Sequence, residues 1–331
     1  SNPGNIVIKV LGTGNTIDNT VNGSIVETSY GIGIYNEGTI NALTNSGLIS
    51  SEEGGVGIDN RSTISTLINA GSITAVGQAF GIQNYGVEAN VTTLTNSGTI
   101  SAGDGGDGIA NSEGIIFTLT NSGTISAGGS GAGIVNFGTI DTLNNSGTIS
   151  AGVHGIGIYN GGGSSITTLN NSDSISVEEF GNGIHNVGTI TSLTNSGTIS
   201  SVIGGVGIRN TDGGTINILN NSGTISPGDE GVGILNDFTI TTLTNSGTIS
   251  AGVVGYGIAN NGGIIDSLTN SGTISAGVGG NGIYNYGGII GSLTNSGTIT
   301  NGNTGITNFG TINTLNNSGT ITNGNTGITN F

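Results

Sequence analysis

The sequence predicts an all-β fold, a single-stranded parallel β-helix (β-solenoid) of about 13 coils with 22 to 27 residues each. Three observations lead to this prediction. The segment Leu94 to Ser101, Leu-Thr-Asn-Ser-Gly-Thr-Ile-Ser, returns with few changes along the chain. Its aliphatic residues stand singly between small or polar neighbours, as in a strand with one buried face. Asn followed two residues later by Gly recurs between them, and both residues favour turns because they tolerate positive φ.

The first residues depart from the repeat. Residues 1–16 are expected to form a cap or an irregular first coil that contains a strand over Ile6 to Val10. Residues 17–331 are expected to form one continuous array. The array is expected to be truncated at its C-terminal end, because the stretch from Asn317 to Phe331 repeats that from Asn295 to Phe309 and no cap follows.

Four apolar positions per coil stay in phase along the chain. Ile40 precedes Leu43 by three residues, Leu43 precedes Ile49 by six, and later coils keep both intervals. A helix is a poor alternative, because glycine costs about 1 kcal/mol relative to alanine in a helix interior and no helical apolar stripe develops. Stacked coils instead bury these positions in columns, and each coil depends on its neighbours to cover them.

Asparagine recurs at the predicted corners. A tight corner would bury the side-chain amide without a partner, unless it donates to its counterpart in the next coil. The recurrence favours such an inward ladder over the alternative that asparagine simply suits turns. The predicted ladder comprises Asn45, Asn69, Asn96, Asn121, Asn145, Asn171, Asn195, Asn221, Asn245, Asn270, Asn295 and Asn317.

Threonine and serine flank the buried isoleucine of each repeat, and the alternation of strand side chains points them outward. Such columns of hydroxyl groups can serve adhesion, self-association or ice binding, or can be small β-formers on the outer face of any solenoid. Aromatic residues near the corners are too scattered in the sequence to predict a site. The possible contact face comprises Thr99, Ser101, Thr124, Ser126, Thr148, Ser150, Thr198, Ser200, Thr248 and Ser250.

Acidic pairs recur in one connection of the coil. Members two or three coils apart would lie about 10–14 Å from one another, too far for most acid and base pairs that cleave a glycosidic bond. They are interpreted as solvated loop charges, with a weak calcium site as the alternative. These pairs are Glu52 and Glu53, Asp104 and Asp107, Glu178 and Glu179, and Asp229 and Glu230.

The remaining ionisable residues predict no reactive centre. His154 and His185 are expected to be single surface residues, and Lys9, Arg61 and Arg209 to make no cluster. The sequence therefore predicts no catalytic residue, no metal site and no cofactor, and the chain is not expected to be an enzyme.

The charge balance limits the partners. Lys and Arg number 3 against 19 Asp and Glu, which gives a formal net charge of −16. Nucleic acids and anionic membrane surfaces require clustered basic residues, so neither is an expected partner. No apolar run reaches the roughly 18 residues of a membrane-spanning helix, so no membrane insertion of this segment is expected.

The two repeated motifs, Leu-Thr-Asn-Ser-Gly-Thr-Ile-Ser and Gly-Ile-x-Asn-x-Gly-Thr-Ile, resemble the passenger regions of bacterial autotransporters from Ile17 onward. Filamentous haemagglutinins and phage tail proteins stack similar coils. The resemblance to autotransporters implies a right-handed β-helix that is secreted and displayed at the cell surface.

These observations lead to one functional expectation and two alternatives. The chain is expected to be an extracellular structural or adhesive rod of a bacterial surface protein, acting in adhesion, self-association or biofilm and fibre formation. Its expected partners are further copies of itself, laterally or end to end, or a host or surface glycan. The alternative is a polysaccharide-binding or polysaccharide-degrading β-helix, and an ice-binding solenoid is less favoured.

Overall fold

The computed structural model describes residues 5–52, 54–323 and 326–331. Over these residues the chain is an all-β parallel β-solenoid of about 13 turns on three parallel sheets, with no helix. This confirms the predicted fold class. The chain divides into two compact units, Ser1–Thr168 and Leu169–Phe331. Each turn contributes one strand to each sheet, in the order sheet A, sheet B, sheet C.

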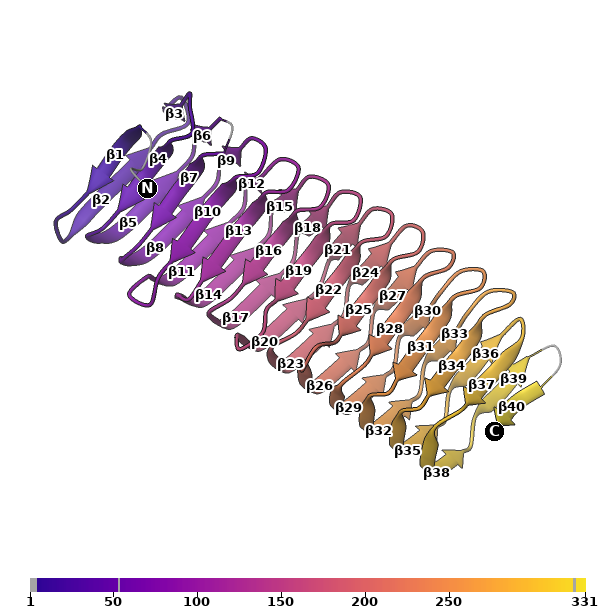
Figure 1. Cartoon of the computed structure of the whole chain (residues 1–331). Coiled ribbons are helices and arrows are strands. Elements are labelled where there is room, and N and C mark those ends of the chain that lie inside the picture. Colours follow the sequence, from indigo (N-terminus) through magenta and orange to yellow (C-terminus); the bar gives the residue numbers. More distant parts are fainter. Residues whose placement is uncertain (1–4, 53, 324–325) are drawn as a thin grey trace. The chain divides into compact units, whose positions relative to one another are not determined.

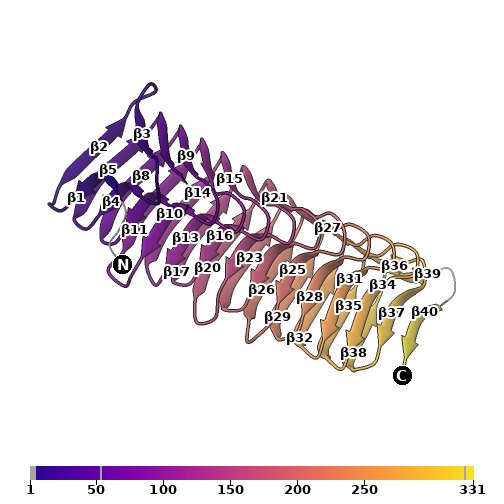
Figure 2. The same ribbon diagram turned by 45° about the horizontal axis from the view of Figure 1, so that its top comes forward.

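Sheet A contains the Gly-Ile-x-Asn motif. Its strands pair in parallel with the corresponding strand of the next turn, so that β10, β13 and β16 lie side by side in the first unit (Figures 1 and 2). In the first unit these are β1 (Ile6–Val10), β4 (Ile32–Asn36), β7 (Val56–Asn60), β10 (Phe80–Tyr85), β13 (Asp107–Ser112), β16 (Ala132–Asn136) and β19 (Ile156–Asn160). In the second unit they are β22 (Asn182–Asn186), β25 (Val206–Asn210), β28 (Val232–Asn236), β31 (Tyr256–Asn261), β34 (Asn281–Tyr286), β37 (Thr304–Asn308) and β40 (Thr326–Asn330).

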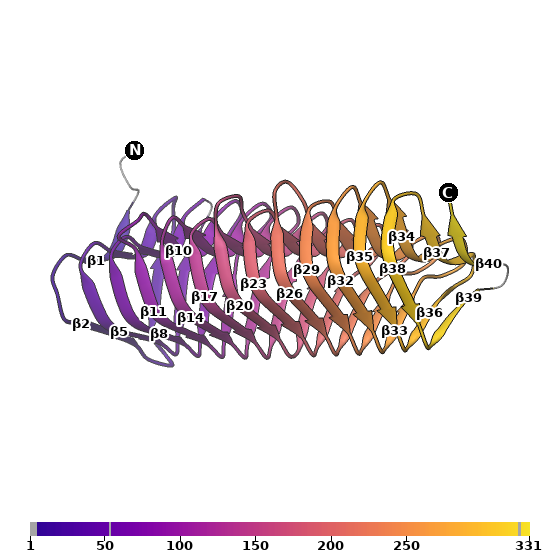
Figure 3. The same cartoon turned by 90° about the horizontal axis from the view of Figure 1, so that it is seen from below.

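Sheet B contains the longest strands, which end at the asparagine of Leu-x-Asn. Figure 3 shows β26, β29, β32 and β35 of the second unit next to one another. The first strands are β2 (Asn15–Asn19), β5 (Thr39–Asn45), β8 (Thr63–Asn69), β11 (Asn90–Asn96), β14 (Ile115–Asn121) and β17 (Thr139–Asn145), and β20 (Ser165–Asn171) crosses the division between the units. The others are β23 (Thr189–Asn195), β26 (Thr215–Asn221), β29 (Thr239–Asn245), β32 (Ile264–Asn270), β35 (Ile289–Asn295) and β38 (Thr311–Asn317).

Sheet C contains the short Thr-Ile-Ser strands. In the first unit these are β3 (Ser24–Glu27), β6 (Leu48–Ser51), β9 (Ser72–Ala75), β12 (Thr99–Ser101), β15 (Thr124–Ala127) and β18 (Thr148–Ala151). In the second unit they are β21 (Ser174–Val177), β24 (Thr198–Ser201), β27 (Thr224–Pro227), β30 (Thr248–Ser250), β33 (Thr273–Ser275), β36 (Thr298–Asn301) and β39 (Thr320–Asn323). A loop then leads from each strand of sheet C to sheet A of the next turn.

The core consists of four columns of identical or nearly identical aliphatic residues. In sheet B, Ile40 pairs with Ile64 and Leu43 with Leu67, and the columns in sheets A and C continue in the same way. These side chains are fully buried through most of both units. Each contributes about 1.5–3 kcal/mol through the hydrophobic effect. A shift of register by one residue would turn every one of them to solvent, so the columns fix the register.

The beginning of the chain pairs with the next turn like the later turns, with one irregularity. Strand β1 pairs with β4 and β3 with β6. Strand β2 pairs with β5 through Ile17 and Leu43, but its register shifts between Asn15 and Thr16. The regular alignment in sheet B therefore starts at Thr16.

The loops between sheets C and A add contacts of their own. In most turns one loop residue adopts a left-handed conformation, and glycine holds this place in some turns, as in Gly204 with φ +64° and Gly279 with φ +81°. Its N–H then donates to a carbonyl in the next loop, for example Gly204 to Asp229 at 2.8 Å. Val254 has φ 59° at the equivalent place and donates to Val278 at 2.9 Å. A β-branched residue is a strained choice there.

Candidate binding faces

The predicted asparagines form rungs at the corner between sheets B and C, and all of them except the exposed Asn317 are buried. Asn96 donates from Nδ2 to Asn121 Oδ1 at 2.7 Å and to the backbone carbonyl of Thr124 at 3.0 Å. Within the first unit the donations run through Asn45, Asn69, Asn96, Asn121 and Asn145, and within the second through Asn171, Asn195, Asn221, Asn245, Asn270, Asn295 and Asn317. The side chains satisfy backbone carbonyls that the corner would otherwise bury unpaired.

A second asparagine ladder occupies the corner between sheets A and B, where the recurrence of asparagine also favours a ladder, although its residues are not among those predicted above. Asn111 donates to Asn136 Oδ1 at 2.8 Å and is fully buried. The signal is the asparagine that ends each Gly-Ile-x-Asn motif. The ladder comprises Asn36, Asn60, Asn84, Asn111, Asn136 and Asn160 in the first unit, and Asn186, Asn210, Asn236, Asn260, Asn285, Asn308 and Asn330 in the second.

The ten threonines and serines of the predicted contact face all lie on sheet C, on either side of a buried isoleucine. Thr99 pairs with Thr124, and Ser101 with Ser126, while Ile100 between them is fully buried. The register continues to Thr148 and Ser150 in the first unit and runs from Thr198 through Thr224 to Thr248 in the second. Thr198 is exposed and the other nine, including Ser200 and Ser250, are half-buried. We call these rows the hydroxyl columns of sheet C.

Sheet B also has hydroxyl columns, which are not among the faces predicted from the sequence. Thr93 pairs with Thr118, and Thr95 pairs with Thr120, and these side chains are half-buried. The signal is the residue on either side of the buried leucine of each repeat. Two of the three outer faces are therefore rows of small hydroxyl residues. The column next to the leucine continues as Thr66, Thr93, Thr118 and Thr142 in the first unit and as Thr242, Ser267, Ser292 and Thr314 in the second.

Sheet A differs, because its outer face carries chemically varied side chains. The position before the ladder asparagine changes from turn to turn, whereas the inward isoleucine next to it does not. In the first unit this outer column is Lys9, Tyr35, Asp59, Gln83, Ala110, Val135 and Tyr159. In the second it is His185, Arg209, Leu235, Ala259, Tyr284, Thr307 and Thr329. On sheet A the chemical character of the outer face therefore differs from one turn to the next.

The cationic groups of Lys9 and Arg61 both lie near the aromatic ring of Tyr35. The prediction that the basic residues make no cluster is therefore wrong for these two. Lys9 Nζ is 5.3 Å and Arg61 Cζ 5.6 Å from the centroid of the Tyr35 ring. Parallel pairing places Tyr35 in the turn between them, and both long side chains reach its ring. Lys9 Nζ lies 3.0 Å from Glu37 Oε2, and Arg61 Nε lies 3.1 Å from Asp59 Oδ2.

The pKa values of the two carboxyl groups in this cluster shift in opposite directions. Burial raises the pKa of Asp59, and the Arg61 guanidinium opposes that rise. Asp59 Oδ1 is buried, and none of the described residues donates a hydrogen bond to it. At the exposed end, hydrogen bonds from Lys9 and then from Tyr35 lower the pKa of Glu37. The cluster already pairs its own charges, so it is primarily a brace across neighbouring turns.

A surface hollow of about 230 Å³ lies over β13, β16 and β19. Asp107, Ala132 and Ile156 occupy one outer column of sheet A, and Val135 and Tyr159 the other. The hollow is lined by these five residues together with Ser130, Gly131 and Phe137. We call it the Asp107 hollow.

Asp107 is not the solvated loop charge that the sequence predicted. It is the first residue of β13 and is half-buried, because the start of the strand brings it onto the face of sheet A. Burial raises the pKa of Asp107 to about 6, although the N–H of Ala132 donates to its Oδ1 at 3.0 Å and opposes that rise. The Phe137 and Tyr159 rings beside it are edge to face with centroids 5.5 Å apart.

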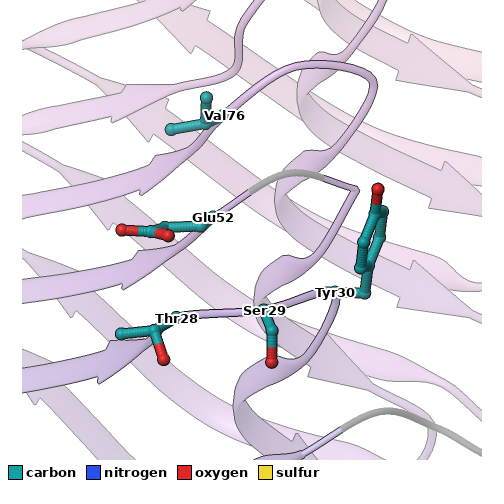
Figure 4. A pocket seen from close by; sticks show the side chains of 5 residues that line it. All are labelled: Thr28, Ser29, Tyr30, Glu52 and Val76. Carbon is teal, nitrogen blue, oxygen red and sulfur yellow. The ribbon is translucent and has the colours of Figure 1, made fainter.

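The other described acids of the predicted pairs do lie exposed in loops, where two of them cap the neighbouring loop. Asp104 Oδ1 accepts the N–H of Gly129 at 2.8 Å, and Asp229 Oδ1 accepts the N–H of Val253 at 2.8 Å. Glu53 lies outside the described residues. Glu52 lines an open hollow of about 360 Å³ with Thr28, Ser29, Tyr30 and Val76. Figure 4 shows Thr28, Glu52 and Val76 in a row, with Tyr30 standing apart from them.

His154 is an exposed loop residue, whereas His185 is not the surface residue that the sequence predicted. His185 belongs to β22, and its Nε2 lies 3.0 Å from Thr211 Oγ1. Burial, and then the charge of Arg209, lower the pKa of His185 to about 4, so it is neutral at pH 7. Within the described residues, no three His, Cys, Asp or Glu side chains come together to hold a metal ion.

Five aromatic residues of the second unit gather along sheet A, so the prediction that the aromatic residues are too scattered to form a site is wrong for these five. The Tyr256 and Tyr284 rings stack with centroids 4.9 Å apart, and Tyr286 stacks on Tyr284 at 6.0 Å. Phe309 contacts both Tyr284 and Tyr286 edge to face and stacks on Phe331 at 4.1 Å. These five residues form the aromatic stripe. Parallel register brings them together from successive turns.

Comparison with known proteins identifies no relative. No family model, no curated protein and no solved structure matches the chain. Over the described residues, none belongs to a helix of the length and hydrophobicity needed to span a bilayer.

Proposed function

We propose that the chain is a structural and adhesive module of an extracellular bacterial surface protein, of the kind found in autotransporter passengers. It would act in adhesion, self-association or biofilm formation through its outer sheet faces rather than through a reaction. The observation that carries this proposal is the in-register repeat of hydroxyl groups on sheet C, from Thr99 to Thr124 to Thr148.

A repeated polar face suits contact with another repeated surface. Neighbouring strands of a sheet lie about 4.8 Å apart, so a second copy presents hydroxyl groups at the same interval. Each hydrogen bond contributes only about 1 kcal/mol, but contacts along one rigid face form together. A glycan surface offers hydroxyl groups that can pair with the same columns.

The test replaces the hydroxyl column of sheet C with lysine. We expect the variant Thr99→Lys, Thr124→Lys, Thr148→Lys to lose the concentration-dependent association of the parent chain in sedimentation velocity, because like charges then face each other. The matched variant Thr93→Lys, Thr118→Lys, Thr142→Lys puts the same charges on the hydroxyl columns of sheet B. Association that is retained in this variant assigns the contact to sheet C, and association that is lost only in this variant assigns it to sheet B. If the parent chain neither self-associates nor adheres to glycan-coated surfaces, the proposal is wrong.

A second candidate function is polysaccharide binding, which the aromatic stripe favours. Aromatic rings bury a large area and can stack on the apolar faces of sugar rings. Tyr286 and Phe309 are 54% and 43% exposed, so their rings are accessible. Retention on insoluble polysaccharide that disappears in Tyr286→Ala, Phe309→Ala would support it. Equal retention of the parent chain and this variant would refute it.

A further inference from the structure

The Asp107 hollow exists because one column of sheet A has a small residue in one turn. Ala132 stands where the turns before and after have larger residues, such as Phe80 and Ile156. Ala132 is 4% exposed and forms the floor, with Val135 beside it at 8%. The ring of Phe137, which is 50% exposed, forms one wall. The result is an apolar recess with one carboxyl group at its edge.

Among the described residues, no cationic side chain pairs with that carboxyl group. Asp107 Oδ1 accepts the N–H of Ala132, and no described residue donates a hydrogen bond to Oδ2. The chain has only three Lys and Arg residues, and the two in the first unit are paired with Glu37 and Asp59. A partly buried carboxylate gains most from an opposite charge that enters the same recess.

We propose that the Asp107 hollow binds an organic ammonium ion. The charged nitrogen would lie against Asp107 Oδ2, and its alkyl groups would pack on Ala132 and Ile156. The faces of Phe137 and Tyr159 attract cations, which is how aromatic recesses recognise methylated ammonium groups. A neutral ligand of the same size could fill the recess but would leave the carboxylate charge uncompensated.

Two sources present this chemistry, a lysine side chain of a partner protein and a free quaternary amine. The recess would treat them differently, because a primary ammonium donates hydrogen bonds to the carboxylate whereas a quaternary one makes only charge and aromatic contacts. The proposal does not depend on self-association of the hydroxyl columns, and either can fail without the other.

Binding should depend on pH through the carboxyl group alone. Among the described residues that line the hollow, Asp107 has the only carboxyl or imidazole side chain. The pKa of Asp107 is about 6 without ligand, and a bound cation favours the ionised form. Affinity should therefore be full above pH 7 and fall as the pH drops below about 6.

The experiment is an amide NMR titration of the full chain at pH 7.5. The probes are tetramethylammonium chloride and n-butylammonium chloride, with tert-butyl alcohol as the neutral analogue and sodium chloride at matched ionic strength. We expect saturable shifts of the Ser130 and Ala132 amides with the ammonium salts only. The tighter of the two ions identifies the preferred source. Equal shifts with sodium chloride or with tert-butyl alcohol would overturn the proposal.

Three variants test whether the ammonium ions bind in the Asp107 hollow. Asp107→Asn should weaken binding about tenfold, because it keeps the shape and the acceptor for Ala132 but removes the charge. Ala132→Ile should abolish binding by filling the recess, and its neighbour Ile156 shows that the column accepts isoleucine. The control Asp141→Asn makes the same charge change on sheet B and should bind like the parent chain. Binding retained in Ala132→Ile, or lost equally in both Asp→Asn variants, contradicts the assignment.

Discussion

Gly133 lies so close to Ile149 of the same turn that a Cβ atom at Gly133 would stand 2.7 Å from Ile149 Cγ2. The glycine of Gly-Ile in sheet A thus faces the core and makes room for the isoleucine of sheet C. The same relationship links Gly57 to Ile73, Gly81 to Ile100, Gly207 to Ile225 and Gly257 to Ile274.

Gly133→Ala should therefore destabilise the chain by about 1–3 kcal/mol, the usual cost of overpacking a core. The backbone carbonyl of Gly157 lies 2.8 Å from the same Cβ position and cannot move aside easily. The midpoint of urea unfolding, followed by circular dichroism, measures the change. Gly129→Ala is the control, since its Cβ would meet its nearest atom at an ordinary 3.4 Å. An equal loss of stability in both variants would show that Gly133 contributes through backbone flexibility and not through the space that it leaves for Ile149.

Asn121→Ala should cost about 2–4 kcal/mol, because it leaves several buried polar groups without partners. Asn121 accepts from Asn96 at 2.7 Å and donates to Asn145 at 2.8 Å and to the carbonyl of Thr148 at 3.1 Å. Denaturant unfolding checks the loss. Asn317→Ala removes an exposed rung of the same ladder and should cost less than about 1 kcal/mol. If the two variants lose the same amount, burial does not govern the strength of the ladder.

Val254→Gly should stabilise the chain, by about 1 kcal/mol, although it removes a side chain. Val254 holds φ 59°, which glycine adopts without strain, and it is 54% exposed, so little packing is lost. Val253→Gly in the same loop is the control and should destabilise by about 0.5–1 kcal/mol, since it only adds chain entropy. The melting temperatures of both variants give the answer. A lower melting temperature for Val254→Gly would mean that the loop relaxes around valine.

Asp107→Asn should become more stable than the parent chain as the pH rises. Because the folded pKa is raised to about 6 from 3.8, the folded state favours the protonated group and Asp107 weakens the fold as it ionises. The advantage of the variant should be absent below pH 4, grow between pH 4 and 6, and level off near 2–3 kcal/mol in order of magnitude. Unfolding midpoints of both chains across this range test it. A constant difference at all pH values would contradict burial as the cause.

Self-association, if it follows the proposal, should strengthen with added salt. Each copy has a formal net charge of −16, and repulsion between copies is screened beyond about 10 Å at 0.1 M salt. Hydrogen bonds between the hydroxyl columns of two copies involve uncharged groups, so added salt should not weaken them. Sedimentation velocity from 20 mM to 500 mM sodium chloride is the measurement. Association that falls over this range would instead indicate contacts between opposite charges.

The sequence alone predicts the places of residues that repeat in every turn. It does not predict the contacts between residues that vary from turn to turn. Ile100 and Asn96 recur at fixed intervals, and a fixed interval in a solenoid is a fixed place in the turn. The neighbours of Asp107 could not be predicted in this way, because Phe137 and Tyr159 belong to later turns and stand at positions where the residue type varies from turn to turn. Whether such side chains meet depends on register and on the size of the residues between them, which only the structure supplies.

The pairing of identical residues in neighbouring turns has a consequence for the gene. Leu94 pairs with Leu119 and Asn96 with Asn121, so a chain that lacked residues 99–123 would join Gly98 to Thr124 with the motif intact. Asn96 would then meet Asn145 in place of Asn121. Recombination between neighbouring repeats can thus add or delete whole turns without creating a misfit. Copy number becomes a trait that selection can adjust separately from the foldability of any turn.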